Sequence, residues 1–121
     1  MIEVEDRIPE ATLWLATAQG GQKIATGAYF AARGARAYWG VYAVSKAALE
    51  MLAGIYAQES QQSNVRVNLV DPGKTRTRMR ANAYPGEDPA TLPAPDSITD
   101  AFVRLACADF TGNGELVKAQ A

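Results

Sequence analysis

The chain has 121 residues, a formal net charge of −1 and a hydrophobic fraction of 48%. These values allow one domain with a core, and they exclude a global field that would attract nucleic acid or an anionic membrane. The absence of histidine excludes Ser-His-Asp and Cys-His catalysis and the usual zinc ligand sets, so no metal site is expected. The single cysteine, Cys107, lies among small apolar residues and is expected to be a buried thiol in a reducing compartment.

No targeting signal is expected from the first residues of the sequence. Residues 1–6 are acidic and lack the basic region and apolar core of a signal peptide. No apolar run approaches the length that spans a membrane. The sequence therefore predicts a soluble, cytoplasmic protein with no membrane partner.

Three segments of the first third carry secondary-structure signals. Residues 10–18 follow Pro9 and precede two glycines, a pattern that predicts a helix. Residues 23–27 predict a short buried strand, and residues 34–40 a connector.

The next predicted element is a long helix over residues 41–60. Between Val41 and Gln58 it carries only two charges, Lys46 and Glu50. An amphipathic surface helix would carry a charged stripe, so a helix that is apolar nearly all round is expected to be covered on more than one side. Because a small domain covers one side, the sequence predicts a homo-oligomer through this helix.

The remaining elements alternate between strand and helix. Residues 64–70 alternate apolar and polar side chains and predict a strand. A helix is expected over residues 101–109, with Ser97 and Asp100 available to cap its start. Residues 115–118 predict a last strand. This alternation predicts an α/β fold with parallel strands and right-handed crossovers.

Tyr42 and Lys46 lie four residues apart at the start of the long helix. That spacing puts the phenol and the ammonium on one helix face, one turn apart. A fixed cation about 4 Å away favours the phenolate by roughly 4 kcal/mol at an effective dielectric near 20. The pKa of Tyr42 is therefore expected to fall from about 10 toward the working pH of a general acid/base. On the spacing alone, two neighbours on a solvated helix face are the simpler interpretation.

A second candidate site follows the strand at 64–70. In an open parallel sheet, ligands bind beyond the carboxyl ends of the strands. Pro72 fixes the chain direction there, and Gly73 lets the backbone approach a ligand closely. Thr75 and Thr77 add hydroxyl groups. Taken alone, this segment is more simply interpreted as a plain strand-to-helix turn.

The two segments together are much more specific. The order Tyr-Ala-Val-Ser-Lys, an alanine-rich helix, a valine-rich strand and Pro-Gly-x-Thr-x-Thr closely resembles the catalytic half of the short-chain dehydrogenase/reductase family. The resemblance runs from about residue 32 to residue 119. It implies that residues 1–121 form one partial domain, the second half of a doubly wound, Rossmann-like parallel sheet.

The resemblance also implies an activity, hydride transfer between NAD or NADP and a small carbonyl or alcohol substrate. Tyr42 would be the general acid/base, and Lys46 would lower its pKa and hold the nicotinamide ribose. The stretch around Tyr84 would form the substrate flap. Four residues would line the nicotinamide end of the cofactor: Pro72, Gly73, Thr75 and Thr77.

Two departures from the family pattern predict that the chain alone is inactive. The family's catalytic serine, about thirteen residues before its tyrosine, corresponds here to Tyr29, whose longer side chain would offer a hydroxyl with a different geometry. The glycine-rich fingerprint is also absent, because Thr26-Gly27 is followed by Ala31 and Arg33 where glycines are needed.

Two other functions stay open. A non-enzymatic remnant of the family would act by pairing with a second copy or an intact relative. An anion or nucleic-acid binder would use four cations, Lys74, Arg76, Arg78 and Arg80. Nucleic acid is not the expected partner, because the remaining chain is acidic and no aromatic residue interleaves the cluster for base stacking.

Overall fold

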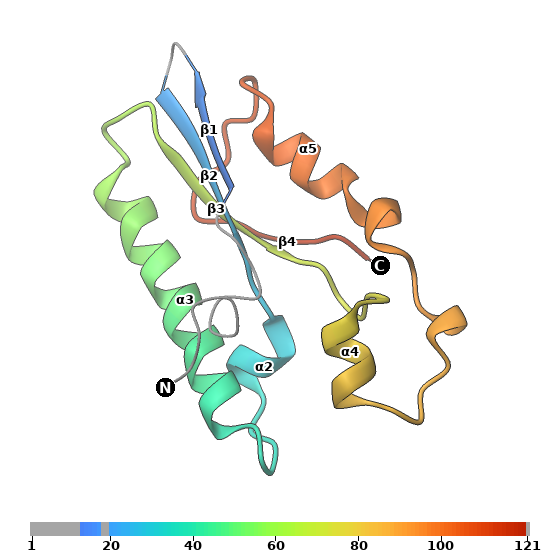
Figure 1. The fold of residues 1–121 in the computed structure, drawn as a ribbon. Coiled ribbons are helices and arrows are strands. Elements are labelled where there is room, and N and C mark those ends of the chain that lie inside the picture. The colour runs from blue at the N-terminus through green and yellow to red at the C-terminus, as the bar shows by residue number, and fades with distance from the viewer. Residues whose placement is uncertain (1–12, 18–19, 121) are drawn as a thin grey trace.

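The computed structural model describes residues 13–17 and 20–120. Figure 1 shows strands and helices alternating along the chain after an initial hairpin. In chain order they are β1 (Leu13–Thr17), β2 (Gly20–Thr26), α2 (Tyr29–Arg33), α3 (Gly40–Glu59), β3 (Arg66–Asp71), α4 (Arg78–Ala83), α5 (Asp100–Ala106) and β4 (Leu116–Lys118), with short 3-10 helices at Pro89–Thr91 and Pro95–Ile98.

The strands form one sheet in the order β1-β2-β3-β4. β2 pairs with β3, and β3 with β4, in parallel. The connection from β2 to β3 carries α2 and α3, and the connection from β3 to β4 carries α4 and α5. The predicted α/β fold with a small parallel sheet is confirmed, and the strands predicted at 23–27, 64–70 and 115–118 match β2, β3 and β4 within a few residues.

The helix predicted over residues 10–18 is wrong where the structure describes it, because residues 13–17 form β1. This strand pairs antiparallel with β2, from Leu13 opposite Ile24 to Thr17 opposite Gly20. An open sheet edge presents a row of unpaired backbone donors and acceptors, and satisfying them outweighs a local helical preference. Residues 10–12 and 18 of that prediction lie outside the described residues.

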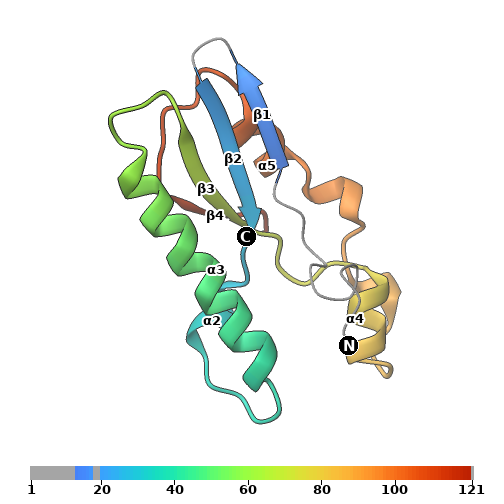
Figure 2. The ribbon, with the colours of Figure 1, turned by 60° about the vertical axis from the view of Figure 1, so that its left-hand side comes forward.

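The sheet is covered by α3 on one face and α5 on the other, as Figures 1 and 2 show. Successive residues of a strand point to opposite faces, so Ala25 and Leu69 pack under α3 while Ile24 and Val70 pack under α5. On the α5 side, Leu105 is only 1% exposed. The core is therefore two thin apolar layers that hold the parallel strands between the helices.

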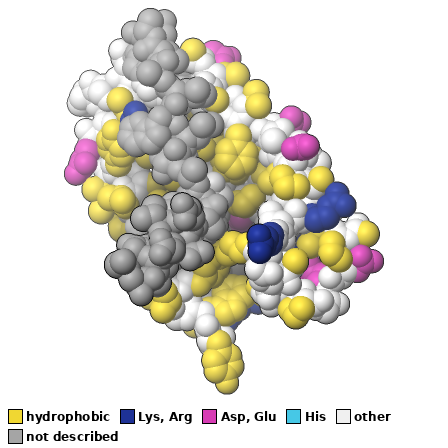
Figure 3. Space-filling model, in the orientation of Figure 1, with side chains coloured by type: hydrophobic (Ala, Val, Ile, Leu, Met, Phe, Trp, Pro, Cys, Tyr) yellow, Lys and Arg dark blue, Asp and Glu magenta, His cyan; other side chains and the backbone are white. Residues whose placement is uncertain are grey.

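The long helix predicted at 41–60 is confirmed as α3, Gly40–Glu59. Within one chain only its inner side is covered. Five apolar side chains on the outer side are largely exposed: Val41, Val44, Met51, Leu52 and Ile55. In Figure 3, hydrophobic side chains reach the surface on the side of the molecule where α3 lies. The expected cover on a second side is therefore not provided by the described residues.

Two predictions around α5 are wrong. Ser97 and Asp100 do not cap the helix, because the N-cap is Thr99 without a side-chain bond and the Ser97 hydroxyl donates to the Ala94 carbonyl at 2.7 Å. Cys107 is exposed, not buried. It follows the last turn of α5, where its thiol leaves the apolar layer and bonds the Val103 carbonyl at 3.2 Å.

Two asparagines fix the loop that leads into β4. Asn68, 1% exposed, donates to the Gly112 carbonyl and accepts from the Glu115 amide, both at 3.0 Å. Asn113 accepts from the Val67 amide and donates to the Ala57 carbonyl, both at 2.8 Å. These bonds anchor β4 beside β3.

Among the described residues, no helix is long and apolar enough to cross a membrane.

Candidate active site

The residues singled out in the sequence gather at the carboxyl ends of the parallel strands. Thr26 ends β2 and Asp71 ends β3. In Figure 2, the first turns of α3 and the whole of α4 lie at this same end of the sheet. This is the edge at which open parallel sheets bind ligands.

Tyr42 and Lys46 share one face of α3, as their spacing predicts. The Lys46 ammonium lies 5.8 Å from the centroid of the Tyr42 ring. It also lies 3.5 Å from the Thr26 carbonyl oxygen, and the residue is only 4% exposed. The rings of Trp39 and Tyr42 pack in a T-shaped arrangement, with ring centroids 5.9 Å apart and an interplanar angle of 86°. α3 therefore directs the amine inward, toward the end of β2.

The expected lowering of the Tyr42 pKa is wrong in this structure. The pKa is raised, first by burial of the phenol and then by the nearby charge of Asp71 and by Tyr84. Burial and a neighbouring negative charge both oppose formation of the phenolate. Because the Lys46 amine approaches the Thr26 carbonyl and lies over the ring face, its attraction for the phenolate does not overcome these effects.

Burial also shifts the pKa of Lys46. Its pKa is lowered from 10.5 to about 8, because desolvation disfavours the ammonium. The amine therefore changes charge close to neutral pH in the ligand-free protein. At pH 7 the pair consists mainly of a neutral phenol and a protonated, buried ammonium.

The loop after β3 is held by its own polar atoms. The Asp71 carboxylate accepts the Gly73 amide at 3.0 Å, and Gly73 has a left-handed φ of 71°, which favours glycine. The buried Thr75 hydroxyl lies 3.4 Å and 3.3 Å from the carbonyls of Pro72 and Gly73. The Thr75 backbone amide has no acceptor among the described residues. A ligand at this edge would thus meet one available backbone donor.

Thr77 is placed differently from Thr75. It is the N-cap of α4, and its hydroxyl oxygen accepts the Arg80 amide at 3.1 Å. This capping bond explains where α4 begins. The hydroxyl hydrogen remains available as a donor, since the capping bond uses only the oxygen.

Tyr29, at the position of the family's serine, lies among cations. The Arg33 guanidinium is 4.3 Å and the Lys118 ammonium 4.5 Å from its ring centroid. Both cations lie at the end of the sheet that carries the candidate site, because Lys118 ends β4 and Arg33 ends α2, the short helix that follows β2. The side chain is thus fixed by cation–π contacts, which is a different setting from a small serine hydroxyl.

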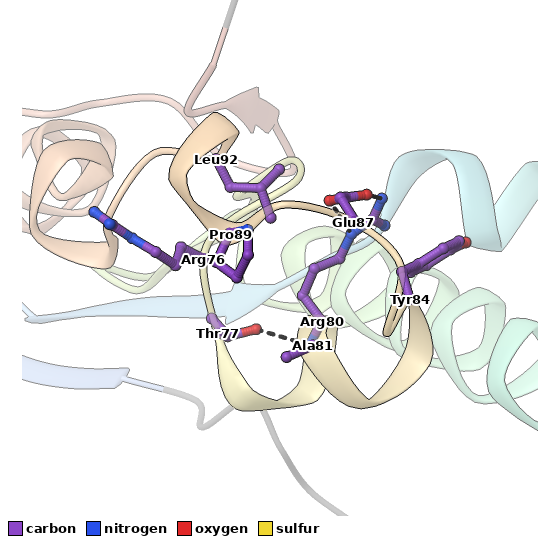
Figure 4. A pocket seen from close by; sticks show the side chains of 8 residues that line it. All are labelled: Arg76, Thr77, Arg80, Ala81, Tyr84, Glu87, Pro89 and Leu92. Atoms are coloured by element: carbon purple, nitrogen blue, oxygen red, sulfur yellow. Dashed lines mark hydrogen bonds and ion pairs between the residues drawn. The ribbon is translucent and has the colours of Figure 1, made fainter.

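In the segment after Thr77, an ion pair joins Arg80 to Glu87, as Figure 4 shows. Arg80 bonds Glu87 through two nitrogens, at 3.1 Å and 2.6 Å, and its guanidinium stacks 3.7 Å from the Tyr84 ring centroid. The paired guanidinium lowers the pKa of Glu87. One member of the predicted cationic cluster is therefore occupied within the protein.

Two contributors to the site were missed by sequence reasoning. Asp71 acts on Tyr42 electrostatically and on Gly73 by a hydrogen bond; the Asp-Pro-Gly order, typical of an Asx turn, was an available signal for the second role. Gln120 contacts the same loop from beyond β4, and no local pattern in the sequence indicates this.

Comparison with known proteins gives a consistent result. A family model described as enoyl-(acyl carrier protein) reductase matches residues 10–96. The chain is 48% identical over 73 residues to the uncharacterized oxidoreductase YciK of Escherichia coli (strain K12), covering 60% of this chain and 29% of that protein.

Solved structures agree with the family match. A short-chain dehydrogenase from Salmonella enterica serovar Typhi has a TM-score of 0.75 and 37% identity, covering 81% of this chain and 40% of that one. A short-chain dehydrogenase from Shigella flexneri, complexed with NADP, has a TM-score of 0.74 and 38% identity, covering 81% and 41%. The chain thus spans less than half the length of each relative. It belongs to the short-chain dehydrogenase/reductase family.

Proposed function

We propose that this chain supplies the substrate side of an NAD(P)-dependent oxidoreductase that interconverts a carbonyl and an alcohol. The observation that carries the proposal is the pairing of Tyr42 with a buried Lys46 at the carboxyl ends of the strands. The neighbouring loop adds a Thr75 amide with no acceptor among the described residues. The proposal therefore puts the proton-transfer group, the Tyr42 phenol, and a hydrogen-bond donor for a bound cofactor, the Thr75 amide, at one edge of the sheet.

Tyr42 acts as the acid in the reducing direction. Its raised pKa keeps the phenol protonated at neutral pH, so it can donate its proton to a carbonyl oxygen as that oxygen gains negative charge. In the oxidising direction the same oxygen accepts the proton of the alcohol. The protonated Lys46 stabilises the tyrosinate left behind, because the opposite charge lies one helical turn away. The nicotinamide supplies or accepts the hydride.

The residues present fit the nicotinamide end of a dinucleotide. Lys46 would hold the ribose, and the loop from Pro72 to Thr77 would line the nicotinamide, with the Thr75 amide as donor. Gly73 has a left-handed φ of 71°, a conformation that favours glycine and turns the main chain at this edge of the sheet. The Shigella flexneri relative was solved with NADP, which supports a nicotinamide cofactor for this chain.

The test is carbonyl reduction by this chain combined with a separately expressed N-terminal half of a related enzyme. We expect NADPH- or NADH-dependent reduction of small aldehydes and ketones in the combined sample, and a loss of on the order of 100-fold or more in Tyr42→Phe, which removes the transferred proton. The control is Tyr38→Phe, an exposed tyrosine, which should leave the rate unchanged. Equal rates for Tyr42→Phe and the unaltered chain would contradict the assignment.

A second candidate function is that of an association module, and the outer face of α3 favours it. The exposed apolar residues recur at intervals of three and four, at Val41, Val44, Ala48, Leu52 and Ile55, which is the spacing of a helix–helix seam. An apolar groove of about 510 Å³ runs beside α3 and is lined in part by Met51, Gly54 and Leu116. We infer that a second copy of the chain covers this face.

Leu52→Glu is expected to weaken that association by about tenfold or more, because a carboxylate would be buried in an apolar seam. Leu52 is 63% exposed in the single chain, so the substitution should leave the fold intact. Val103→Glu is the matched control, since Val103 is 60% exposed on α5, on the other face. Sedimentation at micromolar concentration measures both variants. A stable monomer in the unaltered chain would contradict the inference.

A further inference from the structure

The 72–75 loop is held by a side chain from the far end of the sequence. The Gln120 amide nitrogen donates to the carbonyl oxygens of Pro72 at 2.7 Å and Lys74 at 2.9 Å. It lies 3.5 Å from the Thr75 hydroxyl oxygen. A side-chain amide carries two N–H donors, so the two short bonds use both. One glutamine thus bridges both ends of the turn at Gly73.

The register of β4 brings Gln120 to this place. Lys118 lies opposite Asp71 in the parallel pairing of β3 and β4, and the Ala119 amide continues the pairing by donating to the Asp71 carbonyl at 2.9 Å. The next residue, Gln120, therefore lies beside the loop that follows Asp71. Its position is a consequence of strand pairing and needs no local turn.

Gly73 and Gln120 fit one another closely. A Cβ added at Gly73 would lie 2.9 Å from the Gln120 amide nitrogen, closer than side-chain atoms pack. The φ of 71° at Gly73 also disfavours any side chain there. The amide therefore occupies the space that a larger residue at position 73 would fill.

The bonds from Gln120 also orient the next peptide group. The Lys74 carbonyl points at Gln120, and the described peptide bonds are trans, so the Thr75 N–H points to the opposite side. We propose that Gln120 is a positioning residue: it holds the 72–75 loop so that the Thr75 amide is presented to the nicotinamide of a bound cofactor. This inference rests on the proposed function of the same site.

The test uses the full chain labelled with nitrogen-15. Gln120→Met keeps the side-chain length and removes both donors, while Gln120→Glu faces two carbonyls with a carboxylate. The matched control is Gln61→Met, an exposed glutamine whose side chain donates to Gln58 at 2.8 Å. Backbone relaxation of residues 73–75 is measured without ligand, and the shift of the Thr75 amide is followed while reduced nicotinamide mononucleotide is added.

We expect residues 73–75 to be rigid in the unaltered chain and in Gln61→Met, and mobile in both Gln120 variants. We expect the mononucleotide to bind the unaltered chain weakly and to shift the Thr75 amide without saturation at millimolar concentration. From the initial slope of that shift, we expect an affinity about tenfold lower in the variants. A role in folding alone would lower thermal stability without this loss of affinity. Equal affinity in Gln120→Met, with its fold confirmed by circular dichroism, would overturn the inference.

The ligand-free measurement separates the two proposals. If the mononucleotide shifts no amide in the unaltered chain, the proposed function fails. The role of Gln120 is then decided by the loop itself. Rigid residues 73–75 in the unaltered chain, mobile in both variants, would support it. Unchanged relaxation in the variants would overturn it whatever the ligand does.

Discussion

The 121-residue chain alone is expected to show no turnover of NADH or NADPH. Hydride transfer requires the nicotinamide to be held within about 3–3.5 Å of the reacting carbon. In this chain only the nicotinamide end of the cofactor has candidate contacts, because no glycine fingerprint for the pyrophosphate occurs in its sequence. Tyr29, at the position that the resemblance assigns to the catalytic serine, is expected to add a second loss, since removing one donor to the substrate oxygen typically costs about 100-fold or more in rate.

Fluorescence titration with NADH and NADPH at millimolar concentration measures how much cofactor binding is lost without the pyrophosphate contacts. We expect no saturation with the chain alone. Tyr29→Ser, tested in the sample combined with an N-terminal half from a relative, measures the second loss, and we expect it to raise the rate of carbonyl reduction. Saturable binding and reduction by the chain alone, abolished in Tyr42→Phe, would show that the contacts at the nicotinamide end suffice.

Lys46→Met is expected to stabilise the folded chain at neutral pH. The pKa of Lys46 falls from 10.5 to about 8 on folding, which corresponds to about 3 kcal/mol of destabilisation of the charged, folded state. Below pH 8 the lysine is protonated in both states, so the full penalty applies. Methionine has a similar length and no charge. The gain at pH 7 is expected to be about 1–3 kcal/mol, because the contact with the Thr26 carbonyl is lost.

The pKa shift of Lys46 also predicts in which direction the free energy of unfolding changes with pH. Between pH 8 and 10.5 the unfolded chain binds more protons at Lys46 than the folded chain, so the free energy of unfolding rises with pH. Tyr42 acts in the opposite direction above pH 10, because its raised pKa keeps the proton on the folded state after the unfolded state has lost it. We therefore expect stability to rise from pH 8 to about 10 and then level off.

Urea denaturation at pH 7, 8, 9 and 10 measures the effect. The advantage of Lys46→Met over the unaltered chain should change little from pH 7 to 8 and then shrink from pH 8 to 10. Lys74→Met is the control, since Lys74 is exposed and its loss should leave the pH dependence as it is. A Lys46→Met variant that is less stable than the unaltered chain at pH 7 would mean that the ammonium is well solvated or well paired in the folded protein.

The helix α3 and the parallel strands were predictable because their signals are local. α3 has a long run of helix-forming residues with few charges, and β3 alternates apolar and polar side chains. Elements of this kind keep their structure in any compact fold that buries their apolar positions. The Tyr42–Lys46 pair belongs to the same class, since four residues within a helix always fall on one face.

Two of the failures share a different cause, which is contact with distant residues. Residues 13–17 form a strand because β2 offers an edge to pair with. The pKa of Tyr42 rises because the fold buries the phenol and brings Asp71 near it. Neither effect is encoded in the residues beside Leu13 or Tyr42, so no local pattern predicts them.

By itself, the sequence determined the family, the α/β arrangement and the spacing of the candidate acid/base pair, because each depends on motifs or periodicities within a few residues. Only the tertiary structure decided the direction in which the pKa values of Tyr42 and Lys46 shift, since burial is the largest cause of both shifts. The contact between Gln120 and the 72–75 loop spans more than forty residues and arises from the parallel register of β3 and β4. Strand register is a property of the assembled sheet, so this contact exists only in the folded chain.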